Sequence, residues 1–278
     1  MDGIAAYYDN LARFLDVARR IGRGGGAAQG STHRFLASEA GAASPEQLDH
    51  LVMDAAAGAG LAQTPRVLDA GCGIGGTVFR WHERFGGTYE GLTLSREQRH
   101  RAEAEAHARG VGEACRFHLR SYHHPIPDTF HAAVAIESLA HSPEPDAALA
   151  NIAGALKPGG VFVIVDDMPE GDAQRKMRAA FKSHWRCPVL LDEDSYRAAI
   201  ARAGLSLVRE QDLTPRLRPR PLFWLKILIA AFTAARAISP TCGSRDVCDA
   251  LLGGFILEAL YRKNAMRYRL LVAVKPRA

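Results

Sequence analysis

The sequence predicts an α/β fold built on a largely parallel sheet. The first observation is an apolar strand at 66–69 that runs into a glycine-rich turn at 70–76 and then into a helix at 77–85. The second is that short apolar runs alternate with helical patterns as far as residue 165, as strands joined by right-handed crossovers do. The third is the uniformly apolar run at 161–165, which suits a strand buried on both faces.

The chain ahead of this sheet is expected to be helical with a glycine-rich break. Residues 4–20 place apolar side chains at helical spacing and predict an amphipathic helix. Residues 22–33 are rich in glycine and predict a mobile loop. A second helix is expected at 45–61, with Ser44 as its N-cap and Gln47 as the capping-box partner.

The remaining elements follow from periodicity and from glycine and proline breaks. The expected strands are 88–93, 115–119, 131–136, 161–165, 205–210 and 266–274. The expected helices are 96–109, 145–156, 172–184, 192–203, 222–238 and 246–262, and the proline-arginine stretch 214–221 is expected to be a loop.

The length of 278 residues allows one or two domains. Because the alternating segment 266–274 should return to the sheet as its last strand, we predict one sheet-containing domain at 64–278. A helical segment at 1–63 precedes it, and an α-helical cap is inserted at about 170–262. The 47% hydrophobic and 23% charged residues are ordinary for a globular protein and exclude a disordered or fibrous chain.

Net charge, cysteine content and apolar runs bear on the partners and the cellular compartment of the protein. The net charge of +5 suits an anionic ligand, a membrane surface or nucleic acid and selects none of them. Five cysteines without a C-x-x-C pair, and histidines without ligand spacing, predict no disulfide framework, no metal site and a reducing cytoplasm. No secretory signal is expected, and the apolar run 222–235 is shorter than the roughly 20 residues that span a bilayer. This helix could still contact a membrane peripherally, and a homo-oligomer is left open.

The glycine turn is the sharpest functional signal. Glycines permit close approach of a ligand, and the carboxyl end of the first strand is where open α/β sheets bind ligands. Gly71-x-Gly73-x-x-Gly76 also satisfies the fingerprint of an NAD-dependent oxidoreductase. Asp69, directly before the glycines, would repel a pyrophosphate but suits the cationic amino-acid part of S-adenosylmethionine (SAM).

Together with Lys157-Pro158-Gly159-Gly160 before the fifth strand, this motif resembles the class I SAM-dependent methyltransferases over about residues 64–168. The resemblance implies a Rossmann-like, seven-stranded methyltransferase fold. It also implies SAM as methyl donor, with S-adenosylhomocysteine as product. Around the first motif, the residues implied to contact SAM are Asp69, Gly71, Cys72, Gly73 and Gly75.

A narrower resemblance lies at the second strand. Most members of the family carry an acidic residue at its end, whereas this chain has Thr93 in the run 91–98. That run resembles the group of cyclopropane-fatty-acid synthases and of sterol, tocopherol and prenyl-diphosphate C-methyltransferases. Many relatives also bind the adenine amine through an aspartate after the third strand, where this chain has serine and tyrosine. The further SAM contacts implied in this way are Thr93, Leu94, Gln98, Ser121 or Tyr122, and Ile136.

The segment after the fourth strand supplies the catalytic candidates. Glu137 at a strand end could accept a proton or stabilise a developing cation, and His141 shares its face if the segment is helical. Tyr8 is the third candidate. Alternatively, Glu137 caps the following turn and His141 is a structural histidine. Asp166 and Asp167 end the fifth strand and could orient the acceptor or cap a loop.

Aromatic residues outside the SAM-binding core suit an apolar acceptor pocket, although each one could be simple core packing. If an alkene carbon is methylated, a carbocation forms that aromatic faces and a carboxylate stabilise. Arg218, in the loop 216–220, could bind a diphosphate. Alternatively, the loop is solvated or contacts lipid beside the 222–235 helix. The candidate acceptor-binding residues are Tyr7, Trp185, Tyr196, Arg218, Phe223 and Trp224.

These observations predict a methyltransferase that acts on a hydrophobic small molecule such as an isoprenoid, prenyl diphosphate or sterol. C-methylation of an alkene is the first hypothesis, and O- or N-methylation of a small natural product is the alternative. An NAD-dependent oxidoreductase competes for the glycine turn, and a non-catalytic SAM-binding protein stays open. A nucleic-acid methyltransferase is disfavoured, because the chain lacks a clustered basic and aromatic stripe.

Overall fold

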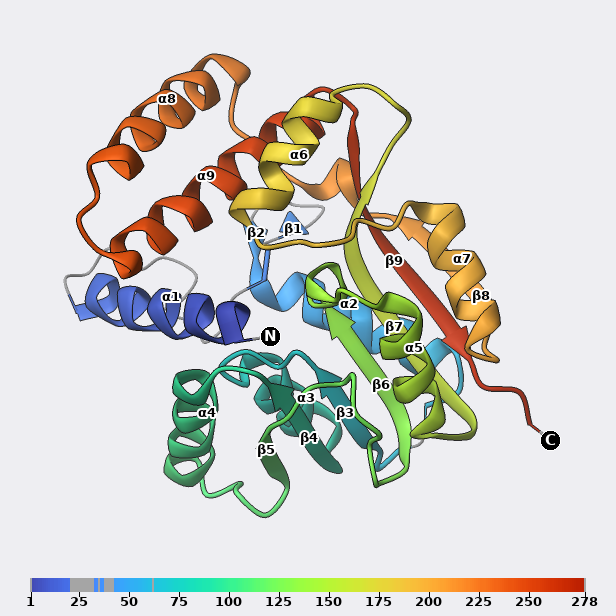
Figure 1. The fold of residues 1–278 in the computed structure, drawn as a ribbon. Helices are drawn as coiled ribbons and strands as arrows, with labels where there is room; N and C mark the ends of the chain where they lie inside the picture. The colour runs from blue at the N-terminus through green and yellow to red at the C-terminus, as the bar shows by residue number, and fades with distance from the viewer. Residues whose placement is uncertain (1, 21–32, 35, 38–42, 62, 278) are drawn as a thin grey trace.

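A computed structural model of the chain describes residues 2–20, 33–34, 36–37, 43–61 and 63–277 (Figure 1). The predicted glycine-rich loop at 22–33 falls, except for His33, outside these described residues. Within them, no helix is long and apolar enough to cross a membrane.

One seven-stranded sheet organises the fold. Its spatial order is β5 (Cys115–Leu119), β4 (Thr88–Thr93), β3 (Arg66–Ala70), β6 (Phe130–Ile136), β7 (Leu156–Pro169), β9 (Met266–Val274) and β8 (Ser206–Asp212). The first five strands in this order pair in parallel, and β9 runs antiparallel to both neighbours. The α/β prediction is confirmed, and so is the return of the last strand to the sheet.

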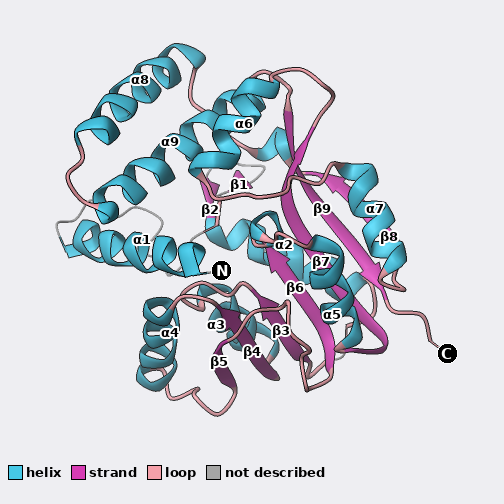
Figure 2. Ribbon diagram, viewed as in Figure 1, coloured by secondary structure: helices cyan, strands magenta, loops and turns pink. Residues whose placement is uncertain are grey.

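Helices cover both faces of the sheet (Figure 2). Because strand side chains alternate between faces, neighbours such as Val67 and Leu68 enter two different apolar cores. The first core also takes side chains from α2 (Pro45–Gly58), α3 (Gly76–Phe85) and α4 (Arg96–Ala108). The second takes side chains from α5 (Pro145–Gly154) and α7 (Glu193–Arg202).

A separate helical group lies where the parallel strands end (Figure 1). It consists of α1 (Asp2–Arg20), α6 (Arg175–His184), α8 (Leu222–Ile238) and α9 (Cys242–Arg262). The long α9 packs against the other three helices. Since α7 and β8 belong to the sheet layers, the region 170–262 is not one continuous unit, and the boundaries of a cap stay a prediction.

Two predictions about helix starts and caps differ from the structure, and each difference has a local cause. Ser44 is the N-cap residue of α2, as predicted, but the capping box is wrong, because Ser44 makes no side-chain capping bond and Gln47 instead accepts from Arg216 at 3.3 Å. The last helix begins at Cys242 rather than 246, because Thr241 and Ser244 form a capping box there.

Strand β7 extends well beyond the predicted 161–165, since its pairing with β9 continues to Pro169. Asp166 and Asp167 therefore lie inside a strand and not at its end. The predicted loop 214–221 contains a short 3-10 turn, Thr214–Arg216. The two-residue strands β1 (Leu36–Ala37) and β2 (Ala43–Ser44) form a small antiparallel pair before α2.

Candidate functional site

The glycine turn after β3 requires residues without a side chain. Gly71 has a φ of 116°, and a Cβ there would lie 2.4 Å from the Cβ of Ser138. Ser138 is itself fixed, because its hydroxyl donates to the carbonyl of Ala70 at 2.6 Å. The turn is also tied to the next strand, since the amides of Gly71 and Cys72 both donate to the carbonyl of Leu92. Gly73 and Gly75 likewise have positive φ, and a Cβ at Gly75 would lie 2.7 Å from the Phe117 ring.

Asp69 lies buried at the end of β3, 5% exposed. Burial raises its pKa to about 7, and the nearby Asp49 adds to the shift while His33 opposes it. A buried carboxyl without a cation beside it prefers to be neutral. An ammonium group bound at the glycine turn would restore its charge, so Asp69 fits the amino-acid part of SAM.

A network of hydrogen bonds joins polar residues at the end of β4. The Thr93 hydroxyl donates to Gln98 Oε1 at 2.8 Å and accepts from the Ser95 amide at 3.1 Å. Asp9, from α1, accepts from the Ser95 hydroxyl and from the Glu97 amide, the latter at 3.2 Å. A carboxylate thus reaches this strand end from the N-terminal helix. Sequence reasoning missed it, because nothing in the sequence links Asp9 to a strand about 80 residues later.

The other predicted SAM contacts lie along the same edge. Ser121 is buried and accepts from the His123 amide at 3.1 Å, while the Tyr122 hydroxyl donates to the carbonyl of Ser138 at 2.9 Å. Ile136 is buried at the end of β6, Cys72 is buried in the turn, and Leu94 is half-buried after β4. Their contacts with SAM stay predictions.

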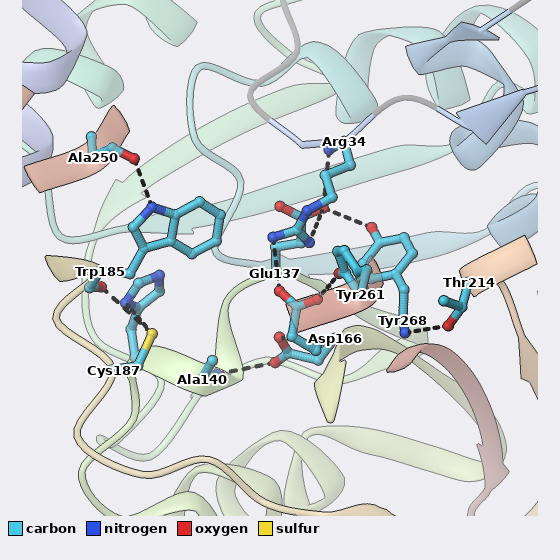
Figure 3. Close-up of polar contacts among 12 residues, drawn as sticks. Arg34, Glu137, Ala140, Asp166, Trp185, Cys187, Thr214, Ala250, Tyr261 and Tyr268 are labelled. Carbon is cyan, nitrogen blue, oxygen red and sulfur yellow. Dashed lines mark hydrogen bonds and ion pairs between the residues drawn. The ribbon is translucent and has the colours of Figure 1, made fainter. Parts of the chain in front are cut away.

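A charged and aromatic cluster surrounds Arg34, beside the end of β6 and the last third of β7. The guanidinium lies 2.8 Å from Asp167 and 3.2 Å from Glu137, at ion-pair distance but without hydrogen-bond geometry. It also lies over three rings, with centroid distances of 5.1, 5.7 and 5.2 Å (Figure 3). We call this set the Arg34 cluster; its members are Arg34, Glu137, Asp167, Trp185, Tyr261 and Tyr268.

Two carboxylates face one guanidinium in the Arg34 cluster. Burial raises the pKa of Asp167 to about 6, although the guanidinium of Arg34 opposes this shift. At neutral pH the Asp167 carboxylate is therefore largely ionised. Its Oδ1 also accepts a hydrogen bond from the Tyr261 hydroxyl.

Glu137 is held in a strained and asymmetric position. Its φ is 51°, a left-handed conformation that costs a non-glycine residue about 1–3 kcal/mol and that is found preferentially at functional sites. Oε1 accepts from the Arg34 amide at 3.0 Å and from the Tyr268 hydroxyl at 2.7 Å, and the ion pair with Arg34 ends on the same atom. Among the described residues Oε2 has no hydrogen-bond partner.

The turn after Glu137 is capped by another carboxylate. Asp166 accepts from the Ala140 amide at 3.0 Å and from the Tyr196 hydroxyl at 3.0 Å. Burial raises the Asp166 pKa to about 7. Glu137 therefore does not have the turn-capping role that the sequence left open.

His141 forms a pair with Tyr8 rather than with Glu137. Residues Leu139–His141 form a 3-10 turn, and the Tyr8 hydroxyl lies 2.6 Å from His141 Nε2. Burial lowers the pKa of His141, opposed by its contact with the Arg186 carbonyl and by Glu137, so the imidazole is neutral at neutral pH. The structure thus presents a neutral imidazole next to a phenol.

The predicted acceptor residues divide into three groups. Trp185 belongs to the Arg34 cluster, and Tyr7 is buried and packs edge-on against Tyr8. Tyr196 is buried in the second core beneath the Asp166 turn. Phe223 and Trp224 are 66% and 57% exposed on α8, so they are not core packing, and their contact with an acceptor stays a prediction. They are exposed because α8 turns Leu225, and not these two residues, toward α9.

The three arginines of the loop 216–220 point to different partners. Arg216 donates to the Ala37 carbonyl at 3.1 Å, and Arg220 pairs with Glu258. Arg218 is exposed and donates to the carbonyls of Pro215 and Leu217 in its own loop. They form no common cradle for an anion, which favours the solvated or lipid-facing interpretation. Among the described residues no three His, Cys, Asp or Glu side chains gather as metal ligands would.

Known proteins share this architecture and this motif. A family model described as a methyltransferase domain matches residues 68–164. "Methyltransferase GfsG" of Streptomyces halstedii is 31% identical over 218 residues, which cover 76% of this chain and 73% of that protein. The geranyl diphosphate 2-C-methyltransferase of Saccharopolyspora erythraea is 46% identical over 71 residues, covering 26% of this chain and 22% of that one.

A solved structure extends the likeness to the whole chain. The geranyl diphosphate C-methyltransferase of Streptomyces coelicolor, in complex with Mg²⁺, geranyl diphosphate and S-adenosyl-L-homocysteine, superposes with a TM-score of 0.72. The two chains are 21% identical, and the match covers 99% of this chain and 97% of that one. At this identity the likeness shows the fold alone, and it confirms the Rossmann-like, seven-stranded methyltransferase fold.

Proposed function

The chain belongs to the SAM-dependent methyltransferases, and we propose that it methylates an alkene carbon of a hydrophobic, isoprenoid-type small molecule. Bound SAM supplies a methyl group that its sulfonium has already activated. Asp69, the glycine turn and the Thr93–Gln98 pair would hold it. The positions of these groups along one strand edge support this assignment.

The observation that carries the proposal is the geometry of Glu137. Its Oε1 is anchored by Arg34 and Tyr268, and its Oε2 has no hydrogen-bond partner among the residues that the structure describes. A general base needs one oxygen free to take a proton while the carboxylate as a whole is oriented. We assign Glu137 the removal of a proton from a carbon bonded to the cationic centre, such as the methylated carbon itself, after methyl transfer has left the positive charge on the adjacent alkene carbon. The electrons of that C–H bond then restore the double bond.

The charge of the Arg34 cluster supports the same chemistry. Two carboxyl groups, those of Glu137 and Asp167, face a single guanidinium here, so acidic groups outnumber basic ones in the cluster. The faces of Trp185, Tyr261 and Tyr268 lie against the guanidinium of Arg34 and partly offset its positive charge. A positive charge that develops on the acceptor is therefore stabilised beside this cluster.

The names of relatives agree with an isoprenoid acceptor, since two of the similar proteins methylate geranyl diphosphate at carbon. The diverging arginines of the loop 216–220 give no support to a diphosphate-binding role for Arg218. On the basis of the Arg34 cluster, we therefore propose that the acceptor carries an isoprenoid-type hydrocarbon. We assign no headgroup to it.

O-methylation is a second candidate, favoured by the Tyr8–His141 pair. A neutral imidazole 2.6 Å from a phenol could take the proton of an acceptor hydroxyl as the methyl group transfers. In that reaction His141 is the base, and no carbocation needs the Arg34 cluster.

Two variants separate these functions. The wild-type chain, Glu137→Gln and His141→Gln are incubated with SAM and with matched alkene and alcohol acceptors, and the products are detected by mass shift. We expect Glu137→Gln to keep its SAM affinity by calorimetry and to lose about 10²–10⁴-fold in alkene turnover. His141→Gln should keep most alkene turnover.

Glu113→Gln serves as the matched control, because this carboxylate is almost fully exposed and pairs only with Arg116 among the described residues. Full alkene turnover by Glu137→Gln would remove the proposed base. Methylation of alcohols alone, lost in His141→Gln, would establish the second candidate instead.

A further inference from the structure

Helix α8 carries an apolar face that nothing in the described residues covers. Phe223, Trp224, Ile227 and Ile238 are 66%, 57%, 44% and 84% exposed. Alanines at helical spacing fill the surface between them. We call this set the α8 face; its members are Phe223, Trp224, Ile227, Ala230, Ala231, Ala234 and Ile238.

The α8 face is continuous along the helix. At 100° per residue its seven members fall within an arc of about 120°, and no polar residue lies inside that arc. The opposite side already packs on α9 through Leu225, with Leu228, Ile229 and Phe232 beside it. Figure 1 shows α8 outside α9, away from the sheet. A helix that is apolar on both sides needs a second apolar environment.

The charges around the helix identify that environment. The stretch 213–245 contains six arginines and lysines and no aspartate or glutamate. Although Arg220 and Arg236 pair with acids of α9, Arg218 and Lys226 are exposed next to the first turns of the helix. An exposed apolar arc bordered by exposed cations matches a surface that has apolar chains beneath anionic headgroups.

A second copy of the chain fits less well. Paired copies usually meet through a two-fold axis, which places a patch against itself. The same cations would then face one another across the contact. An acidic lipid surface instead meets every one of these charges with its opposite.

We propose that the α8 face inserts into the headgroup and outer acyl region of an anionic membrane, with α8 lying along the surface. Phe223, Trp224, Ile227 and Ile238 enter the apolar layer, and Arg218 and Lys226 contact the lipid phosphates. The helix has 17 residues and does not cross the bilayer. This inference goes beyond the proposed function and does not depend on which acceptor is methylated.

The test uses the full chain and lipid vesicles without acceptor. Vesicles of phosphatidylcholine alone, and with about one third phosphatidylglycerol, are sedimented with the protein at low and high salt. We expect binding to the anionic vesicles, at least tenfold weaker binding to the neutral ones, and release by salt. Emission from Trp224 should shift to the blue on binding, and Trp224→Phe should remove that shift.

The double variant Phe223→Ser/Trp224→Ser should lose most vesicle binding and keep its melting temperature, because both side chains are exposed. Val208→Ser, which removes a side chain 56% exposed on β8, is the matched control and should bind like the wild type. Lys226→Ala should weaken binding by about fivefold.

Two results would overturn the proposal. One is equal vesicle binding by the wild type and the double variant, or no binding by either. The other is a wild-type dimer in sedimentation velocity that the double variant abolishes, which would assign the α8 face to a second copy.

Discussion

The packing of Trp185 against α9 gives a sharp prediction for Gly253→Ala. A Cβ at Gly253 would lie 1.9 Å from Trp185 Cδ1 and 2.5 Å from its Nε1. The indole must therefore move by about 1.5 Å to reach ordinary van der Waals contact. In doing so it strains its 2.9 Å hydrogen bond to the Ala250 carbonyl and its stacking over Arg34.

The expected change in the free energy of unfolding is the sum of opposing contributions. Alanine in place of glycine within a helix stabilises the fold by about 0.5–1 kcal/mol. Overpacking costs about 1–3 kcal/mol, and weakening the indole hydrogen bond costs about 1 kcal/mol. We expect Gly253→Ala to lower the free energy of unfolding by about 1–3 kcal/mol, or the melting temperature by about 2–4 °C for each kcal/mol.

The neighbouring glycine is the matched control, because a Cβ at Gly254 would meet no atom within 4 Å. Gly254→Ala should therefore stabilise α9 by about 0.5–1 kcal/mol. Thermal unfolding measures both variants, and turnover of an alkene acceptor should fall about tenfold in Gly253→Ala alone, with SAM affinity unchanged. Equal melting temperatures and equal turnover for the two variants would show that Trp185 yields without cost and would refute this reasoning.

The other predictions concern the glycine turn and the buried charges. Gly71→Ala should weaken SAM binding more than tenfold by calorimetry, because its φ of 116° and the clash with Ser138 both oppose a side chain; unchanged affinity would contradict this. Asp69→Asn should abolish tight SAM binding yet stabilise the unliganded protein. Because the folded-state pKa of Asp69 is raised to about 7, the free energy of unfolding of the wild type falls as the pH rises from about 4 to about 7. The stabilisation of Asp69→Asn over the wild type should therefore be absent near pH 4 and reach at most about 4 kcal/mol above pH 7, as measured by denaturant unfolding. Arg34→Met should cost about 2–4 kcal/mol at pH 8 and less at pH 5, because Asp167 without its cation takes up a proton more readily; a cost independent of pH would argue against the ion pair.

The sequence alone determined the framework of the fold and located the candidate SAM-binding edge of the sheet. Alternating apolar runs and helical patterns depend on neighbours within a few residues, so they predicted the strands, most helices and the return of 266–274. The glycine turn is equally local, because strand, glycines and helix follow one another directly. Asp69 and Thr93 were found for the same reason, each standing at the end of a recognisable strand.

The tertiary structure alone decided the acceptor side. Arg34 reaches Glu137 across 103 residues, and Tyr268 reaches it across 131. No local period encodes such meetings, because they depend on how the N-terminal segment, α9 and β9 dock at one end of the sheet. The same docking turned Phe223 and Trp224 outward, although their sequence is as apolar as a core helix. Local spacing fixes which elements form, whereas the side of each element that is buried is set by the partner it packs against.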